Sequence, residues 1–320
     1  MNKEIILSAK DVEISFNLRG RTLNAIRKCS LDLYKGETLA IVGESGSGKS
    51  VFTKAFLGML EANGSVTGGS IMYHDIDLAK FTKEKEWLTI RGKKIAMVMQ
   101  DPMTSLDPLM TVGKQIKESI QKNQGLRGSA AKEKAIEMLK KVGIPDAEKR
   151  YNQYPHEFSG GMRQRIGIAR ALIMEPEFIV ADEPISALDV SIRAQVLNLL
   201  NDLKVKKGLT YLFIAHDLSV VRYISDRVAV IHKGRIVELA ETEELFEHPL
   251  HPYTKALLSA VPIPNPTLER EKKLLVYNPA MHDYSKDLPV WEEIKPGHFV
   301  YGNQIELEQY RKELNNNIIA

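Results

Sequence analysis

Short apolar runs recur along the chain, and each ends at a polar or glycine-rich segment. Continuous runs of this length are typical of strands buried on both faces of a parallel sheet. They occupy residues 38–42, 94–99, 177–181 and 209–214. Segments with helical spacing of apolar residues lie between them, at 51–57, about 112–142 with a break at 125–129, 159–172 and 190–203. The pattern predicts an α/β fold.

The remaining segments of the chain follow other patterns. Residues 1–36 alternate apolar and polar positions, which indicates strands, and the charged residues 80–91 predict a surface helix. Between them, the glycines at 63–69 predict a turn, which is followed by a strand at 70–73. Two apolar runs around Lys233 and Gly234 predict a hairpin. Prolines recur from Pro249 onward, which predicts an appendage rather than core.

A glycine-rich loop follows the apolar run 38–42 and precedes a predicted helix. It fits the pattern G-x-x-x-x-G-K-[ST], which binds phosphate in this context. Its glycines let backbone N–H groups converge, and the helix N-terminus adds partial positive charge. Lys49 is predicted to reach the β- and γ-phosphates of ATP, and the Ser50 hydroxyl to ligate Mg²⁺. The predicted nucleotide-binding residues here are Gly43, Glu44, Ser45, Gly46, Ser47, Gly48, Lys49, Ser50 and Val51.

Polar residues stand at the ends of the other apolar runs. In an open α/β sheet these positions converge at the edge where the glycine loop lies. Asp182 is predicted to hold Mg²⁺, Glu183 to polarise the attacking water, His216 to contact the γ-phosphate, and Gln100 to reach metal or water. Each alone is usually solvated or structural, but together they indicate a hydrolytic site. Phe16 is a candidate to stack on adenine; the alternative is that it packs in the sheet.

Composition narrows the class of protein. The 320 residues are 43% hydrophobic and 27% charged, which is ordinary for a globular protein with ample core. A net charge of +3 gives no strong electrostatic case for nucleic acid. The single cysteine, Cys29, excludes an internal disulfide or a multi-cysteine metal site within this chain. No apolar run approaches the roughly 18 residues of a spanning helix, and no signal peptide is apparent.

The order of these motifs resembles the nucleotide-binding subunit of ABC transporters over about residues 5–260. The resemblance implies a P-loop NTPase (RecA-like) core with an antiparallel β subdomain and an α-helical signature subdomain at about 101–170. It makes residues 1–260 the nucleotide-binding domain and 261–320 a C-terminal extension. It also implies that residues 43–50 are Walker A, Gln100 the Q-loop, Asp182 and Glu183 the Walker B and catalytic acids, residues 186–189 the D-loop, and His216 the switch histidine.

In this family the signature residues, here Ser159, Gly160 and Gly161, close over the ATP of a second subunit that pairs head to tail. One Walker A is present, so the resemblance implies a second copy or a paralogue as partner. Met162 stands where the family usually has Gln, and a thioether cannot make the hydrogen bonds of an amide.

Several sequence segments, such as QDPMTSLDP and HPLHPYTKALLSAVP, resemble those of oligopeptide and dipeptide permease ATPases. Residues up to about 165 resemble the D-type subunit of these importers, and later residues resemble the F-type. The alternatives are a hybrid of the two types and ordinary drift within the subfamily. Many relatives carry a cysteine-rich iron–sulfur site in the C-terminal extension, and this tail has no cysteine. Packing or partners would have to order the tail, or it would stay loose.

Together, the motifs and the resemblance predict an ATP hydrolase that powers peptide import from the cytoplasmic face of the cell membrane. Its implied partners are a second nucleotide-binding subunit, two permease transmembrane subunits and, indirectly, an extracellular or periplasmic peptide-binding protein. Nickel or another small solute is an alternative cargo. The rival functions are a cassette that binds ATP with weak or no turnover, and an ABC-type ATPase acting on nucleic acid. A nucleic-acid clamp would need a coiled-coil insertion, two cassettes or a basic stripe, which this sequence lacks.

Overall fold

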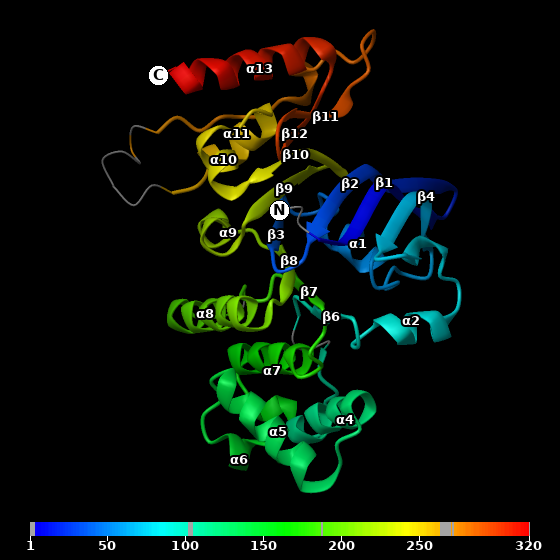
Figure 1. Ribbon diagram of the computed structural model, residues 1–320, viewed down its shortest axis with the longest axis vertical. Coiled ribbons are helices and arrows are strands. Elements are labelled where there is room, and N and C mark those ends of the chain that lie inside the picture. Colours follow the sequence, from blue (N-terminus) through cyan, green and yellow to red (C-terminus); the bar gives the residue numbers. More distant parts are fainter. Residues whose placement is uncertain (1–3, 102–104, 187, 263–269, 271, 320) are drawn as a thin grey trace.

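The computed structural model describes residues 4–101, 105–186, 188–262, 270 and 272–319 (Figure 1). Ala187 of the predicted D-loop and the prolines at 264 and 266 lie outside the described residues. The main sheet has the strand order β11-β12-β10-β9-β3-β8-β7-β6. Its strands are β3 (Thr38–Val42), β6 (Ile95–Val98), β7 (Phe178–Asp182), β8 (Thr210–Ile214), β9 (Arg227–His232), β10 (Arg235–Glu241), β11 (Val290–Lys295) and β12 (His298–Gly302).

Strands β9, β3, β8, β7 and β6 are parallel, as the apolar runs predict. Every residue of β3, β7 and β8 is buried, because core clusters cover both faces of the sheet. The predicted hairpin is present, with β10 antiparallel to β9. The helices after these strands are α1 (Lys49–Ala55), α7 (Gly160–Leu172), α8 (Val190–Lys207) and α9 (Leu218–Ile224).

A second, antiparallel sheet has the order β2-β1-β4-β5 and lies beside the main one (Figure 1). It contains β1 (Ile5–Leu18), β2 (Arg21–Tyr34), β4 (Gly64–Tyr73) and β5 (Ile76–Asp77), followed by helix α2 (Glu84–Ile90). The predicted glycine turn at 63–69 is therefore mostly wrong. The glycines serve close packing within β4: the Phe16 ring lies over Gly64, and Gly69, at φ 77°, sits against the backbone of Asp11.

A helical part projects from the other end of the main sheet, at the bottom of Figure 1. It consists of α4 (Val112–Gln124), α5 (Gly128–Lys141), α6 (Ala147–Arg150) and α7. The break between α4 and α5 falls at Gly125, whose φ of 68° ends the helix in the left-handed conformation. None of the helices in the described residues is long and apolar enough to span a membrane.

The C-terminal segment joins the main sheet. Strand β12 pairs with β10 and with β11, after α10 (Thr242–Glu247) and α11 (Pro252–Ser259). Helix α13 (Gln304–Ile319) covers β12 through a core of its own, at the top of Figure 1. The prediction of an appendage outside the core is wrong for these elements, since packing orders them. The domain boundary at residue 260 stays a prediction.

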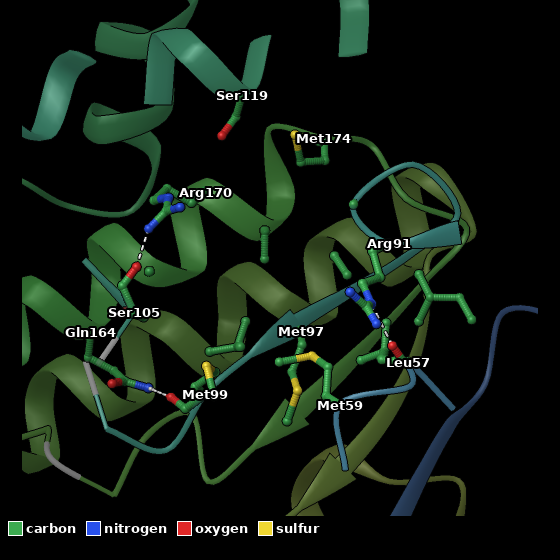
Figure 2. A pocket seen from close by; sticks show the side chains of 16 residues that line it. Leu57, Met59, Arg91, Met97, Met99, Ser105, Ser119, Gln164, Arg170 and Met174 are labelled. Atoms are coloured by element: carbon green, nitrogen blue, oxygen red, sulfur yellow. Dashed lines mark hydrogen bonds between the residues drawn. The ribbon is translucent and has the colours of Figure 1, made fainter. Parts of the chain in front are cut away.

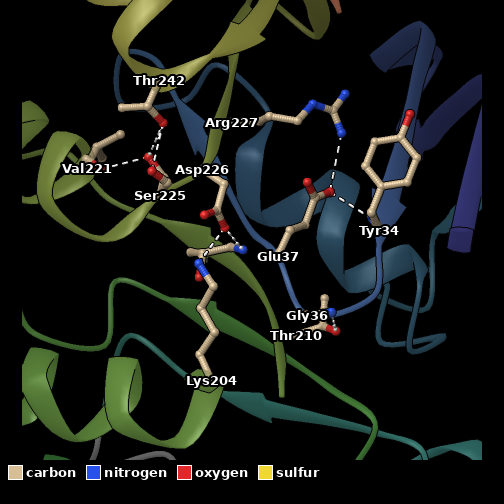
Figure 3. Close-up of polar contacts among 11 residues, drawn as sticks. Tyr34, Gly36, Glu37, Lys204, Thr210, Val221, Ser225, Asp226, Arg227 and Thr242 are labelled. Atoms are coloured by element: carbon tan, nitrogen blue, oxygen red, sulfur yellow. Dashed lines mark hydrogen bonds and ion pairs between the residues drawn. The ribbon is translucent and has the colours of Figure 1, made fainter. Parts of the chain in front are cut away.

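Hydrogen bonds lock the beginnings of the parallel strands together (Figure 3). Asp226, before β9, accepts a hydrogen bond of 2.6 Å from the backbone N–H of Thr38 and pairs with Lys204 of α8. The Thr210 hydroxyl of β8 accepts from the Gly36 N–H at 2.8 Å. Because the amino ends of β3, β8 and β9 are fixed in register, their carboxyl ends reach one edge together.

A buried ion pair lies beside these contacts. Glu37 and Arg227 are 5% and 6% exposed, and Glu37 Oε1 lies 3.2 Å from Arg227 Nη1. The same oxygen accepts a 2.8 Å hydrogen bond from the Tyr34 N–H, and Arg227 donates to the Asp32 carbonyl at 3.1 Å. The guanidinium also lies over the Tyr34 ring, 4.8 Å from its centre (Figure 3). The pair ties β2 and β9 to the start of β3.

Candidate functional site

The glycine loop lies between β3 and α1, as the sequence predicts. Gly43 has φ 152°, and a Cβ there would lie 2.2 Å from the Ile231 carbonyl oxygen, so a larger residue would clash with β9. The Lys49 ammonium folds back over the loop and donates to the carbonyls of Gly43 and Glu44, each at 2.9 Å. Burial lowers the pKa of Lys49, against the nearby carboxylates of Glu183 and Asp182. The loop carbonyls therefore hold the positively charged ammonium group of Lys49 against the loop.

Ser50 and Asp182 come together across the sheet. The Ser50 hydroxyl donates a 3.1 Å hydrogen bond to Asp182 Oδ1, and Asp182 is 4% exposed. Burial raises the pKa of Asp182, while the bond from Ser50 lowers it. A buried carboxylate beside a hydroxyl suits a hard cation. The described residues contain no group of three or more His, Cys, Asp or Glu that could hold a metal.

Glu183 is the centre of a polar cluster at the ends of β6, β7 and β8. Gln100 donates to Glu183 Oε2 at 2.7 Å, and His216 Nε2 contacts Glu183 Oε1. Glu183 is 7% exposed and has φ 48°, in the left-handed region that non-glycine residues rarely adopt. Its N–H donates to the Ile214 carbonyl at 3.0 Å, so β8 holds the turn. The structure thus brings Gln100, Glu183 and His216 into direct contact.

A cavity of about 600 Å³ opens between these groups and the glycine loop. Lys49, Ser50, Gln100, Glu183 and His216 all line it. So does Phe16, which is half-buried and packs over Gly64, so it both faces the cavity and packs in the second sheet.

Sequence reasoning missed part of this cavity. Lys233 and Gly234, in the β9–β10 turn, line it, and the Gly234 N–H donates to the Ser47 carbonyl at 2.7 Å. Asn24 and Arg27 of β2 line it as well. Lys233 and Gly234 could have been predicted to lie at the site, because they form a turn directly after an apolar strand. Asn24 and Arg27 could not, because the alternating pattern of β2 does not indicate that the middle of this strand faces a ligand.

The structure does not bring Ser159, Gly160 and Gly161 to this cavity, since none of the three lines it. Ser159 caps α7, and its hydroxyl accepts a 3.3 Å hydrogen bond from the Met162 N–H. Ser159 is exposed, and nothing lies within 4 Å of a Cβ built on Gly160. Met162 packs its side chain on the main core. The beginning of α7 is therefore an open helix N-terminus.

A second cavity, of about 340 Å³, lies between the main sheet and the helical part (Figure 2). Met59, Met97, Met99 and Met174 face it. Its wall links α7 to the segment after β6 that carries Gln100. Gln164 donates to the Met99 carbonyl at 3.3 Å, and Arg170 donates to the Ser105 carbonyl.

Comparisons with known proteins identify the family of this chain. The family described as ABC transporter matches residues 26–186, and the oligopeptide/dipeptide transporter C-terminal region matches 237–286. The oligopeptide transport ATP-binding protein OppF of Streptococcus pyogenes serotype M1 is 53% identical over 97% of this chain and 99% of its own length. AmiE of Streptococcus pneumoniae serotype 4, another oligopeptide transport ATP-binding protein, is 54% identical over 81% of this chain and 73% of its own.

Solved structures show the same fold. The dimeric post-hydrolysis state of the ATP-binding cassette MJ0796, bound to ADP and Pi, matches with a TM-score of 0.68 and 28% identity. The match covers 74% of this chain and 98% of that one. Another dimeric structure of MJ0796, described as a bacterial ABC transporter cassette, matches with a TM-score of 0.66.

Proposed function

This chain belongs to the ABC transporter family of ATP-binding subunits, and from that premise we propose that it hydrolyses ATP to power the import of oligopeptides. The observation that carries the hydrolytic part is the single edge at which Lys49, Asp182 and Glu183 meet. The cargo is inferred from the oligopeptide transport proteins that align along nearly the whole chain. Uptake of a labelled oligopeptide by cells that carry the chain, with nickel uptake as the contrast, tests the cargo.

The positions of the site residues support the following roles. The loop N–H groups and Lys49 bind the phosphates of ATP, and Phe16 stacks on the adenine. Ser50, Asp182 and Gln100 would hold Mg²⁺, which would supply positive charge to offset the negative charge of the phosphates. Glu183 accepts a proton from the attacking water, and His216, in contact with Glu183, keeps that carboxylate oriented toward the γ-phosphate.

Ser50→Ala should weaken activation by Mg²⁺ by about tenfold, because it removes one metal ligand and the hydrogen bond that orients Asp182. The measurement is the Mg²⁺ concentration that gives half-maximal ATPase rate. Ser45→Ala, in the same loop and outside the bond to Asp182, is the control. Equal Mg²⁺ dependence in both variants would remove Ser50 from the metal site.

Two subunits are needed for one complete site. Ser159 is exposed at the N-terminus of α7 and does not line the cavity of its own chain, so it can meet ATP held by another subunit. The similar cassette MJ0796 is described as dimeric in its solved structures. We propose a head-to-tail pair of this chain with itself or with a paralogue.

The ATPase rate per chain should therefore rise with protein concentration before it levels off. Ser159→Asp sharpens the test, because Asp still caps α7 while its charge repels the γ-phosphate across the interface. Ser159→Asp and Glu183→Gln chains should each be inactive, and a mixture should recover turnover, since one of the two sites in a mixed pair is intact. A rate per chain that is independent of concentration, with no recovery on mixing, argues against a shared site.

The methionine-lined cavity of Figure 2 is our candidate for the contact with the permease subunits. Unbranched Met side chains adapt to the shape of an inserted helix. The cavity lies directly beside the strand that leads to Gln100, so closure at the ATP site can move its wall through Gln164 and Arg170. Binding there would hold the chain at the cytoplasmic face of the membrane as a peripheral subunit.

A further inference from the structure

Tyr253 lies in the C-terminal region that the family comparison matches at residues 237–286, and it contacts the phosphate loop. Tyr253, in the first turn of α11, accepts a 3.0 Å hydrogen bond on its hydroxyl from the backbone N–H of Glu44. Glu44 is the second residue of the loop, and it does not line the nucleotide cavity. The contact therefore supports the loop from outside the cavity.

The peptide group that Tyr253 holds also accepts a hydrogen bond from Lys49. Gly43 supplies its carbonyl, which accepts from the Lys49 ammonium at 2.9 Å, and Glu44 supplies its N–H. A peptide group is planar, and in the trans form its C=O and N–H point in opposite directions. Fixing the N–H on Tyr253 thus fixes the direction in which the carbonyl points, and with it one of the two acceptors of Lys49.

Tyr253 itself is held rigidly. Its side chain is 1% exposed, and its ring packs against those of His232, 4.2 Å away between centres, and Tyr277, 5.4 Å away. Burial raises the pKa of Tyr253 to about 12, so its hydroxyl is protonated at neutral pH. A fixed, neutral hydroxyl is a suitable acceptor for a backbone N–H.

The support continues into the C-terminal strands. Glu238 of β10 is fully buried, and its carboxylate accepts from the Leu250 N–H at 2.8 Å and the His251 N–H at 3.0 Å. His298 of β12 lies 2.9 Å from the same carboxylate. His251 Nδ1 in turn accepts from the Tyr253 N–H at 3.1 Å. A continuous set of contacts therefore runs from β12 to the phosphate loop.

We propose that Tyr253 is a positioning residue of the ATP site, through which the C-terminal region sets the affinity for nucleotide. The inference rests on the proposed function, because it assumes that Lys49 binds the phosphates of ATP. A merely structural Tyr253 would stabilise α11 without changing nucleotide affinity.

Tyr253→Phe is the test, since it keeps the ring and removes only the acceptor. We expect affinity for a fluorescent ATP analogue to fall about three- to tenfold, the worth of one hydrogen bond. KM for ATP should rise by the same factor while kcat changes little, because Glu183 and its partners are untouched. Tyr277→Phe removes a hydroxyl from the same aromatic group, and no hydrogen bond among the described residues joins it to the loop. This control should keep wild-type affinity.

Equal nucleotide affinity in the two variants would overturn the inference. A second measurement needs no variant: the Glu44 amide, in an exposed residue, should be protected from hydrogen exchange in the wild-type chain, and rapid exchange would also overturn it. Wild-type turnover, measured alongside, separates the two proposals. A chain that binds nucleotide without hydrolysing it contradicts the proposed function, while the comparison of Tyr253→Phe with Tyr277→Phe still decides the role of Tyr253.

Discussion

Glu183→Gln should lower the rate of ATP hydrolysis by about a hundredfold to ten-thousandfold, the usual contribution of a general base. Gln fills the same space, and its amide oxygen can accept from Gln100 as Glu183 Oε2 does at 2.7 Å. Its amide group can also face the His216 ring. The cluster therefore keeps its shape and loses the one group that can take a proton from water.

ATP binding should survive this change, because Glu183 is not among the groups that hold the phosphates. The two measurements are steady-state turnover and the amount of ATP, as against ADP, that remains bound after gel filtration. We expect bound ATP to accumulate, together with a dimeric species. Glu61→Gln is the matched control, since Glu61 also lines the cavity and the change removes the same charge. It should keep most of the turnover.

An unchanged rate in Glu183→Gln would point to the rival reading, a cassette that binds ATP with little turnover of its own. Met162 is the residue that keeps this reading open. Its backbone N–H bonds the Ser159 hydroxyl, as an N-capping contact requires, but its thioether packs on the core and offers no amide to a partner subunit. In that case activity would require a paralogue with an intact catalytic site.

The parallel part of the fold and most of the candidate site could be predicted from sequence. The reason is local: strands such as β3 and β7 are apolar throughout, so they are buried on both faces and their first polar residues fall at one edge of the sheet. The sequence alone therefore predicts that Gln100, Glu183 and His216 lie together. Their mutual contacts then follow from the sheet order β8-β7-β6.

The remainder depends on contacts between distant segments. Glycines such as Gly64 and Gly69 indicate a turn by composition, yet they lie in β4 because Phe16 and Asp11 pack against them from β1. Prolines in the tail predict irregular structure, but β12 pairs with β10 and thereby extends the main sheet. The hydrogen bond between the Glu44 N–H and the Tyr253 hydroxyl joins residues 209 apart in the chain, and neither local sequence predicts this contact.

The mixed ancestry of the chain stays a hypothesis. OppF of Streptococcus pyogenes aligns over 97% of the chain and AmiE over 81%, at 53% and 54% identity. Since both relatives are oligopeptide transport ATP-binding proteins, the proposed cargo does not depend on the outcome.

Glu37→Ala should destabilise the fold by about 3–5 kcal/mol, the usual cost of leaving one member of a buried ion pair without its partner. Arg227 would keep its charge at 6% exposure, beside the Asp32 carbonyl and the Tyr34 ring, without the carboxylate of Glu37. The Tyr34 N–H would also lose its acceptor. Because Glu37 directly precedes β3, the loss should loosen the strand that carries the phosphate loop, and ATP binding should weaken in parallel. Urea unfolding measures the first effect.

Two further variants show whether burial is the cause. Glu4→Ala breaks the neighbouring ion pair between Glu4 and Lys35, in which both side chains are more than half exposed. This change should leave the urea midpoint of unfolding nearly unchanged. Glu37→Leu combined with Arg227→Met removes both buried charges, and it should recover much of the stability that Glu37→Ala loses. If the double variant were instead as unstable as Glu37→Ala, the hydrogen bonds to Tyr34 and Asp32, rather than an uncompensated charge, would hold β3 in place.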